Sequence, residues 1–198
     1  GNQAISLLLA TVVKIKASLG NQQYKRMCPI CGKGSDHFLQ YGVKPRPDAL
    51  CPRCYSLERH RLFWMYLSKK TSLINVPPKK ALHIAPESVL ELKLRPLIGE
   101  GYLTADLYAQ NVDLKMDITE IDFPDNSFDF IYCSHVLEHV TEDIRAMREF
   151  NRVLRHGGIA FIMVPIHAKK TVEDSSVVDP KERLRLYGQE DHVRIYGQ

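Results

Sequence analysis

The sequence predicts an α/β protein in which a mostly parallel sheet follows a small cysteine-rich module. Two Cys-Pro-x-Cys frames lie close together in the first third of the chain. From residue 81 onward, short apolar runs alternate with helix-like segments, which is typical of parallel strands joined by crossover helices. The charge divides in the same way, since residues 1–80 carry +11 and residues 81–198 carry −7. Such asymmetry indicates modules with different partners.

The first 23 residues predict an N-terminal helix. Their apolar positions form one helical stripe: Ile5, Leu8, Leu9, Val12 and Val13. No run of about 18 apolar residues exists and no basic residue precedes this stretch, so we expect neither a membrane span nor a signal peptide. We expect a cytoplasmic protein whose helix docks on the body of the chain, with attachment to a membrane surface as the alternative.

Four of the five cysteines predict a structural zinc site in a zinc-ribbon module. A two-residue spacer lets one tight turn direct two sulfurs at one ion, and the 19 residues between the frames are enough for a hairpin that brings the second turn opposite. A redox pair, a disulfide framework and an iron–sulfur centre fit the spacing less well. A closed four-sulfur shell leaves no position for catalysis. The predicted ligands are Cys28, Cys31, Cys51 and Cys54.

A helix is expected directly after the second frame, over residues 56–67. Ser56 is a good N-cap, and Leu57, Trp64 and Leu67 share one face. Basic side chains near this frame suit contact with an anion; they are Arg53, Arg59 and Arg61. Three parts of the chain are therefore expected: the N-terminal helix over residues 1–23, the zinc-ribbon module with its helix over 24–75, and an α/β domain over 76–198.

The α/β domain is expected to contain five strands and two helices. The second helix should end at Gly157 and Gly158, and Arg155 and His156 should lie in its last turn. Only 33 residues follow Pro165, and most are polar or charged, so the last strands of the usual sheet are expected to be missing. An uncovered sheet edge would favour a homo-oligomer. The expected strands are 81–85, 101–106, 112–118, 128–133 and 159–164, and the expected helices are 90–97 and 141–154.

Two acids are expected at the carboxyl edge of this sheet, where open α/β sheets bind ligands. Asp106 ends the second strand and can accept from ribose hydroxyls, whereas Asp117 ends the third and can accept from an exocyclic amine. No glycine-rich phosphate cradle or Walker lysine is present, which disfavours ATP and dinucleotides. The pair indicates an adenosine without phosphates.

Residues 116–140, which run from Met116-Asp117-Ile118 through Pro124-Asp125-Asn126-Ser127 to Leu137-Glu138-His139, closely resemble class I, Rossmann-like S-adenosylmethionine (SAM)-dependent methyltransferases of the type 11 group. Residues 149–158 resemble the following helix and glycine turn of that family, and the resemblance covers about residues 80–165. It implies SAM as cofactor, with Asp106 at the ribose and Asp117 with Ile118 at the adenine. Ser134 and His135 would line the pocket near the methionine part. The full set of cofactor-binding residues expected on this basis is His83, Ala85, Pro86, Glu87, Asp106, Leu107, Asp117, Ile118, Ser134 and His135.

The first loop departs from the family pattern D-x-G-x-G-x-G, since residues 83–89 contain no glycine. Glycines there let the backbone approach the ligand closely. Either the cofactor binds more weakly, or Glu87 has taken over the contact with the methionine amino group. We favour the second alternative because the other anchors are present.

Methyl transfer to an unidentified acceptor is the expected function, with RNA or a small anionic metabolite or glycan intermediate as acceptor. His135 is the candidate general base, although lining the cofactor or structuring its loop is the alternative. Residues 133–136 lack the [DN]-P-P-[FY] pattern of enzymes that methylate exocyclic amines of nucleic-acid bases. The rival function is that of a non-catalytic SAM-binding, nucleoside-binding or zinc-dependent nucleic-acid-binding protein with a degenerate fold.

Overall fold

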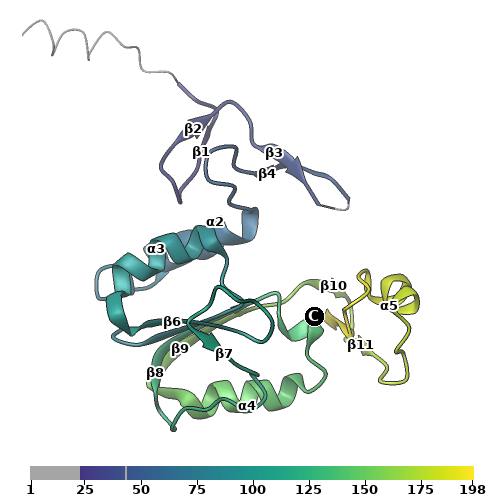
Figure 1. Cartoon of the computed structure of the whole chain (residues 1–198). Helices are drawn as coiled ribbons and strands as arrows, with labels where there is room; N and C mark the ends of the chain where they lie inside the picture. Colours follow the sequence, from purple (N-terminus) through teal and green to yellow (C-terminus); the bar gives the residue numbers. More distant parts are fainter. Residues whose placement is uncertain (1–22, 43) are drawn as a thin grey trace, which may run out of the picture. The chain divides into compact units, whose positions relative to one another are not determined.

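The structure, a computed structural model, describes residues 23–42 and 44–198 (Figure 1). The expected N-terminal helix therefore lies largely outside the described residues. The chain divides into two compact units, one up to Leu62 and one from Phe63 onward, and each is described by itself. Within the described part of the chain, no helix combines the length and the apolar character needed to cross a membrane.

Two short antiparallel hairpins build the first unit. In one, β1 (Arg26–Met27) pairs with β2 (Gly34–Ser35), and in the other, β3 (Leu39–Tyr41) pairs with β4 (Arg46–Leu50). The first cysteine frame forms the turn between β1 and β2, where the amide of Cys28 donates to the carbonyl of Lys33 at 3.1 Å. The second frame follows β4 directly. Each hairpin therefore presents one pair of sulfurs on a tight turn.

The helix after the second frame begins later and runs further than expected. α2 spans Glu58–Lys70. Ser56 does not open the helix; its hydroxyl lies 3.4 Å from the sulfur of Cys28 and 3.3 Å from that of Cys54. The amide of Leu57, just before the helix, donates to Nδ1 of His60 at 3.1 Å. The imidazole thus takes the role expected of the Ser56 hydroxyl, which was to accept from an amide at the start of the helix.

Five parallel strands form the main sheet of the second unit, in the order β7-β6-β5-β8-β9. The strand that comes first in sequence lies in the middle, and the sheet grows from it in both directions, as the predicted Rossmann-like fold requires. Figure 1 shows α3 (Ser88–Ile98) and α4 (Asp143–Val153) on opposite faces of this sheet. The strands are β5 (Ala81–Ile84), β6 (Tyr102–Asp106), β7 (Leu114–Lys115), β8 (Phe128–Ser134) and β9 (Leu154–Met163).

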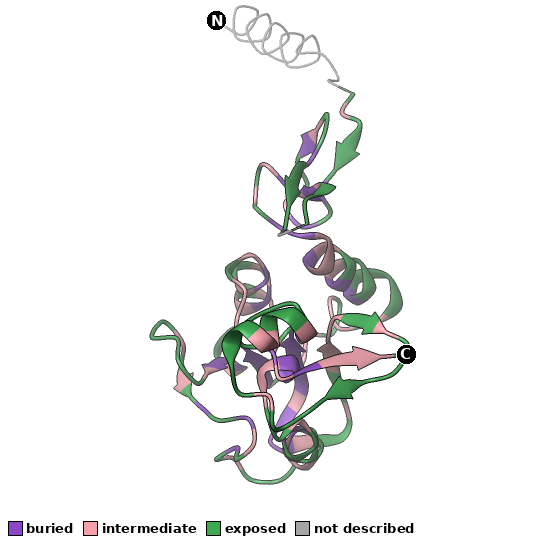
Figure 2. Ribbon diagram, turned by 90° about the vertical axis from the view of Figure 1, so that its right-hand side faces the viewer, coloured by how far each residue is buried: buried purple, intermediate pink, exposed green. Residues whose placement is uncertain are grey.

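The central strands β5 and β8 are buried on both faces, which explains their continuous apolar runs in the sequence. Figure 2 shows the buried residues gathered in the interior of this unit. On one face, the ring of Phe63 from α2 lies 4.1 Å from that of Tyr132 and 4.8 Å from that of Phe161, measured between centroids. On the other face, α4 buries Ala146, Phe150 and Val153, which the helical period places on one side.

The glycine pair expected to end the second helix has another role. α4 ends at Val153, and β9 begins with the next residue, so Arg155 and His156 lie in a strand. The pairing moves from Phe128↔Leu154 to Phe130↔Ile159, which leaves extra residues of β9 in a bulge around Gly157 and Gly158. Gly157 has φ +77°, and a Cβ on Gly158 would lie 2.9 Å from the carbonyl oxygen of Arg155. The bulge needs both glycines because a side chain fits neither position well.

Residues 166–197 form a small second sheet, although the sequence predicted no strand there. The strand order in this sheet is β10-β12-β11. Along the chain, α5 (Pro180–Tyr187) lies between β11 and β12. The strands are β10 (Ile166–Ala168), β11 (Val172–Glu173) and β12 (Arg194–Gly197). Asp179 caps α5 by accepting from the amide of Lys181, and Gly188 ends it in the left-handed conformation.

Candidate functional site

The carboxyl edge of the main sheet brings the expected site residues to neighbouring strand ends. The loop after β5 starts at Ala85, whose amide donates to the carbonyl of Ala105 on β6 at 2.8 Å. Asp106 ends β6, and its carbonyl accepts from the amide of Met116, directly before Asp117, at 3.2 Å. The ends of β5, β6 and β7 are therefore joined to one another by backbone hydrogen bonds.

Each of the two acids uses one carboxylate oxygen to shape its own loop. Oδ1 of Asp106 accepts from the amides of Tyr108 and Ala109, both at 2.7 Å. Oδ1 of Asp117 accepts from the amide and the hydroxyl of Thr119, both at 2.8 Å. Among the described residues, no side chain or amide donates to either Oδ2. The second oxygen of each acid is therefore not used by the loop that it shapes.

The hydrophobic neighbours of these acids lie differently. The side chain of Leu107 is 48% exposed, next to Asp106. Ile118 is buried in the core cluster beneath the sheet edge, so its side chain anchors the loop and only its backbone is left for a ligand.

Buried contacts orient the loop after β5. His83 is 1% exposed, and its Nδ1 lies 2.5 Å from the hydroxyl of Tyr102. Its Nε2 lies 3.3 Å from Oε2 of Glu87, whose side chain is 16% exposed. His83 is thus a core residue that positions Glu87 rather than a residue that faces solvent. Ala85 has φ +48°, a left-handed conformation that is strained for a residue with a Cβ. Pro86 follows it, half-buried.

The end of β8 contributes Ser134 and His135. The Ser134 hydroxyl is buried and has no hydrogen-bond partner within the described ranges, and such a group normally has one. His135 follows with φ +56°, and its Nδ1 lies 3.2 Å from Oε1 of Glu138. The preceding Cys133 is fully buried, and burial raises the pKa of its thiol, so it stays a neutral core residue. The end of β8 thus combines a buried hydroxyl without a partner and a residue with a strained backbone, whose imidazole is 39% exposed.

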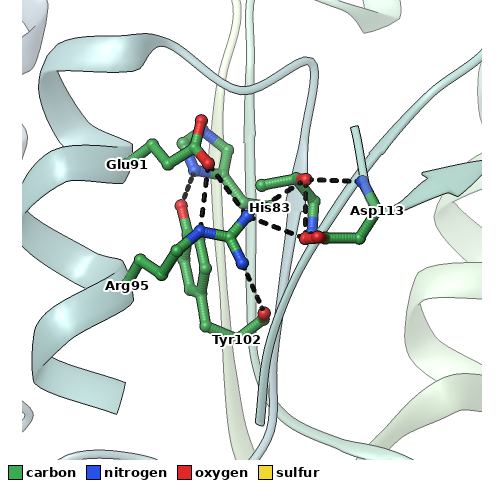
Figure 3. A network of polar contacts seen from close by, with 6 residues as sticks. His83, Glu91, Arg95, Tyr102 and Asp113 are labelled. Atoms are coloured by element: carbon green, nitrogen blue, oxygen red, sulfur yellow. Dashed lines mark hydrogen bonds and ion pairs between the residues drawn. The ribbon is translucent and has the colours of Figure 1, made fainter. Parts of the chain in front are cut away.

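A network of ion pairs and hydrogen bonds stabilises the carboxyl edge of the sheet near β6 (Figure 3). Arg95 of α3 donates to Glu91 and to Asp113, both at 2.8 Å. Asp113 also accepts from the amide and the hydroxyl of Thr104, both at 2.8 Å. The network joins α3, β6 and the segment before β7, and so positions Asp106 two residues beyond Thr104. The spacing of Glu91 and Arg95 was readable in the sequence, whereas the distant Asp113 was not.

A second network positions the loop that follows Asp117. Glu149 of α4 accepts from the amide of Ile121 at 2.8 Å and pairs with Arg152 at 2.7 Å. Arg152 also donates to the carbonyls of Ile121 and Phe123 at 2.8 and 2.7 Å. The bonds from Arg152 lower the pKa of Glu149 to about 2. Helix α4 therefore fixes the loop through an ionised carboxylate.

The four predicted zinc ligands meet in the first unit. Their sulfurs all lie within 4.8 Å of one another. The separations of 3.7 Å between the sulfurs of Cys28 and Cys54 and of 4.0 Å between those of Cys31 and Cys51 are far longer than a disulfide bond. Burial opposes ionisation of Cys28, but hydrogen bonds from Ser56 and neighbouring amides lower its pKa to about 7. Four soft donors at this spacing fit a tetrahedral Zn²⁺ ion.

One of the three arginines expected to contact an anion is used within the first unit. Arg61 donates to the carbonyl of Ser56 at 2.6 Å, and its guanidinium lies 4.6 Å from the centre of the Phe38 ring. Arg53 is exposed and Arg59 is half-buried. Arg61 is therefore already engaged within the unit, and the three arginines do not form one open anion-binding cluster.

Comparison with known proteins finds similarity to methyltransferases within the second unit. Residues 100–162 match the protein family described as a methyltransferase domain. The chain is 32% identical over 99 residues to the ubiquinone/menaquinone biosynthesis C-methyltransferase UbiE of Hahella chejuensis. The matched residues make up 49% of this chain and 37% of that protein. This chain is 26% identical over 106 residues to the ajmaline N-methyltransferase of Rauvolfia serpentina, which covers 53% and 34%. The chain spans about a third of the length of these curated relatives.

Solved structures match the chain with lower identity and with TM-scores below 0.5. The YcgJ protein of Bacillus subtilis is 23% identical, with a TM-score of 0.44 over 60% of this chain and 56% of that one. The methyltransferase CalH, solved with S-adenosylhomocysteine, is 19% identical, with a TM-score of 0.37 over 54% and 40%. Residues 100–162 are thus similar to a methyltransferase domain, and they lie in a parallel sheet whose strand order fits the Rossmann-like fold of class I methyltransferases.

Proposed function

We propose that this chain binds SAM at the carboxyl edge of the main sheet and transfers its methyl group to an acceptor. The observation that carries the proposal is the pair Asp106 and Asp117, each of which keeps one oxygen for its own loop and leaves Oδ2 for a ligand. The similarity of residues 100–162 to a methyltransferase domain supports it. When bound, SAM supplies an electrophilic methyl group on a positively charged sulfur.

Each anchor has a part of the cofactor that suits it. Oδ2 of Asp106 would accept from the ribose hydroxyls, and Oδ2 of Asp117 from the adenine amine, since both groups are donors. The buried Ser134 hydroxyl and the Glu87 carboxylate would hold the methionine end, Glu87 by pairing with its amino group. The protein's task is alignment of donor and acceptor in a dry pocket.

His135 is the residue that we propose as general base. Glu138 engages its Nδ1, which leaves Nε2 to take a proton from the acceptor. Glu138 would then act as a positioning residue that also stabilises the imidazolium. An acceptor that is already a good nucleophile needs no base, and lining the cofactor is then the role of His135.

Calorimetry with S-adenosylhomocysteine on the full chain tests the binding step directly. We expect saturable binding with one site per chain. An absence of binding would contradict the proposal. Binding without transfer of labelled methyl groups to any RNA or small anionic acceptor would favour a non-catalytic SAM-binding protein, for which the glycine-free loop at Ala85 is the supporting observation.

We also propose that the four cysteines of the first unit hold a structural zinc ion, supported by the mutual distances of their sulfurs. The +11 charge of residues 1–80 supports an anionic partner for the front part of the chain. If RNA is the acceptor, the logarithm of its affinity should fall linearly with the logarithm of salt concentration, whereas salt-independent affinity would exclude this reading. The cytoplasmic location, the homo-oligomer and the three-part division at residues 23 and 75 stay predictions.

A further inference from the structure

A second group of metal-ligating side chains lies at the end of β8, in the second unit. Glu138 and His139 belong to the short helix η2 (Leu137–His139), and His192 lies just before β12. One ligand atom of each residue lies within 4.8 Å of those of the other two. The sequence did not indicate this group because its members lie far apart along the chain.

Backbone contacts hold the two segments together without a ligand. The amide of Val193 donates to the carbonyl of Glu138 at 2.9 Å. Arg194, whose side chain is 5% exposed, donates to the carbonyls of Leu137 and Thr141 at 3.0 and 2.9 Å. His192 is therefore fixed beside Glu138 and His139 by its own neighbours in sequence.

Both histidines have a partner at Nδ1, which leaves Nε2 as the ring nitrogen available to a metal. Nδ1 of His139 lies 3.1 Å from Oδ2 of Asp191. Nδ1 of His192 donates to the carbonyl of Tyr187 at 3.2 Å. Metal-binding histidines almost always direct their second ring nitrogen to a carboxylate or a carbonyl in this way, and the contact sets the tautomer.

Glu138 supplies the independent indication of a ligand. Its side chain is 1% exposed, and Oε1 lies 3.2 Å from Nδ1 of His135. Oε2 is buried and, in the part of the chain that the structure describes, has no hydrogen-bond partner. A buried carboxylate oxygen without a partner is costly, and a cation beside it removes that cost.

We propose that Glu138, His139 and His192 bind a divalent transition-metal ion. Two imidazoles and one carboxylate are a ligand set that suits Zn²⁺, and three protein ligands leave a coordination position for water or another oxygen ligand. The site differs from the cysteine cluster in its donors, nitrogen and oxygen in place of sulfur. Through the contact of Glu138 with His135, it lies beside the carboxyl end of β8, where the acceptor of the proposed reaction would approach.

Metal analysis of the full chain after saturation with Zn²⁺ and gel filtration tests the proposal. Wild type should retain about two ions per chain, and the His192→Ala and Glu138→Gln variants about one. His167→Ala is the matched control. His167 is an exposed histidine of β10, in the small sheet that also contains β12, and its replacement should leave the count at two ions per chain.

Substitution with Co²⁺ assigns each ion to its site. The sulfur site gives thiolate-to-cobalt absorption in the near ultraviolet, whereas the nitrogen–oxygen site gives only ligand-field bands in the visible. His192→Ala should lose the second signal and keep the first. The proposal is overturned if wild type gains no visible signal beyond that of the sulfur site, or if His167→Ala loses as much metal as His192→Ala. Should Glu138→Gln fail to fold, His139→Ala replaces it, because that side chain is already partly exposed.

Discussion

At the scale of single residues, Asp106 has two separable roles. Oδ1 shapes the loop through the amides of Tyr108 and Ala109, and Oδ2 is the oxygen that we propose accepts from the ribose. A hydrogen bond to a charged group contributes about 1.5–3 kcal/mol, so Asp106→Ala should weaken binding of S-adenosylhomocysteine about 10- to 100-fold in calorimetry. Asp106→Asn should also weaken it, with an unchanged thermal midpoint, because the amide oxygen can keep the loop contacts while the charge is lost.

The matched control for Asp106 is Asp122→Ala, an exposed acid outside the proposed anchors. It should bind S-adenosylhomocysteine as wild type does. Equal affinity of wild type and Asp106→Ala would refute the assignment of the ribose anchor.

Glu87 should be selective for one end of the cofactor. It lies after β5, in contact with His83, and the proposed partner is the methionine amino group. Glu87→Ala should therefore weaken S-adenosylhomocysteine but leave the affinity for adenosine unchanged, since adenosine lacks that group. Asp106→Ala should weaken both ligands. Calorimetry with the two ligands distinguishes these patterns, and an equal loss for both in Glu87→Ala would show that the loop is only distorted.

At the scale of elements, the attachment of the loop over residues 117–126 to α4 should depend on pH. The pKa of Glu149 is about 2 in the folded protein, against about 4.3 in an unfolded chain. A lowered pKa means that the contribution to stability is complete above the unfolded value and is lost as the pH falls toward 2. The difference in free energy of unfolding between wild type and Glu149→Gln should thus be constant above about pH 5 and shrink below about pH 4.3.

Urea denaturation of both proteins from pH 7 to the lowest pH at which they fold measures this difference. Asp113 and Asp129 are present in both proteins, so their contributions cancel in the difference between the two free energies of unfolding. Burial opposes the shift of their pKa values, but hydrogen bonds and arginine partners lower both. A difference that stays flat through pH 4 would mean that Glu149 contributes through its shape and not through its charge.

The sequence predicted the elements whose signal is local. Buried strands such as β5 and β8 are apolar runs, and α4 has a helical stripe ending at Val153. The pair Gly157 and Gly158 was misassigned because a helix stop and a strand bulge require the same residue type. The strands beyond Pro165 are short, and β10 pairs with β12, from which β11 and α5 separate it in sequence, so no alternating pattern marks them.

The candidate site divides in the same manner. The position of Asp106 at a strand end could be predicted because β6 is an apolar run, whereas β7 ends at Lys115, two residues before Asp117, and is shorter than predicted. The meeting of the cysteine frames could be predicted because their spacing is regular. The core position of His83 depends on Tyr102, and the grouping of Glu138 with His192 depends on the docking of Arg194. Those relations exist only in three dimensions.

At the scale of the whole molecule, the cysteine cluster should control the order of the first unit alone. The described residues of this unit, 23–42 and 44–62, form two short hairpins with few buried apolar side chains, so the proposed zinc ion would supply much of their stability. Cys51→Ser should lose the sulfur-bound metal and the near-ultraviolet Co²⁺ absorption. Hydrogen exchange should become fast in residues 23–62 and stay slow in the strands of the main sheet.

Cys133→Ser is the control, because Cys133 is a cysteine buried in β8 and far in sequence from the frames. It should retain the metal at the sulfur site even if the main sheet is destabilised. Unchanged exchange in residues 23–62 of Cys51→Ser would contradict the coupling between metal and folding.

The docking of Arg194 on the carbonyls of Leu137 and Thr141 also sets an order in time. A ribosome adds about 5–20 residues per second, so β8 and η2 leave the exit tunnel several seconds before the arginine that completes their surroundings. During that interval the nascent chain can already form the parallel sheet, but η2, which follows His135, does not yet have its contacts with Arg194. The surroundings of η2 should therefore be completed only after the segment around residue 194 has emerged and Arg194 has docked on the carbonyls of Leu137 and Thr141.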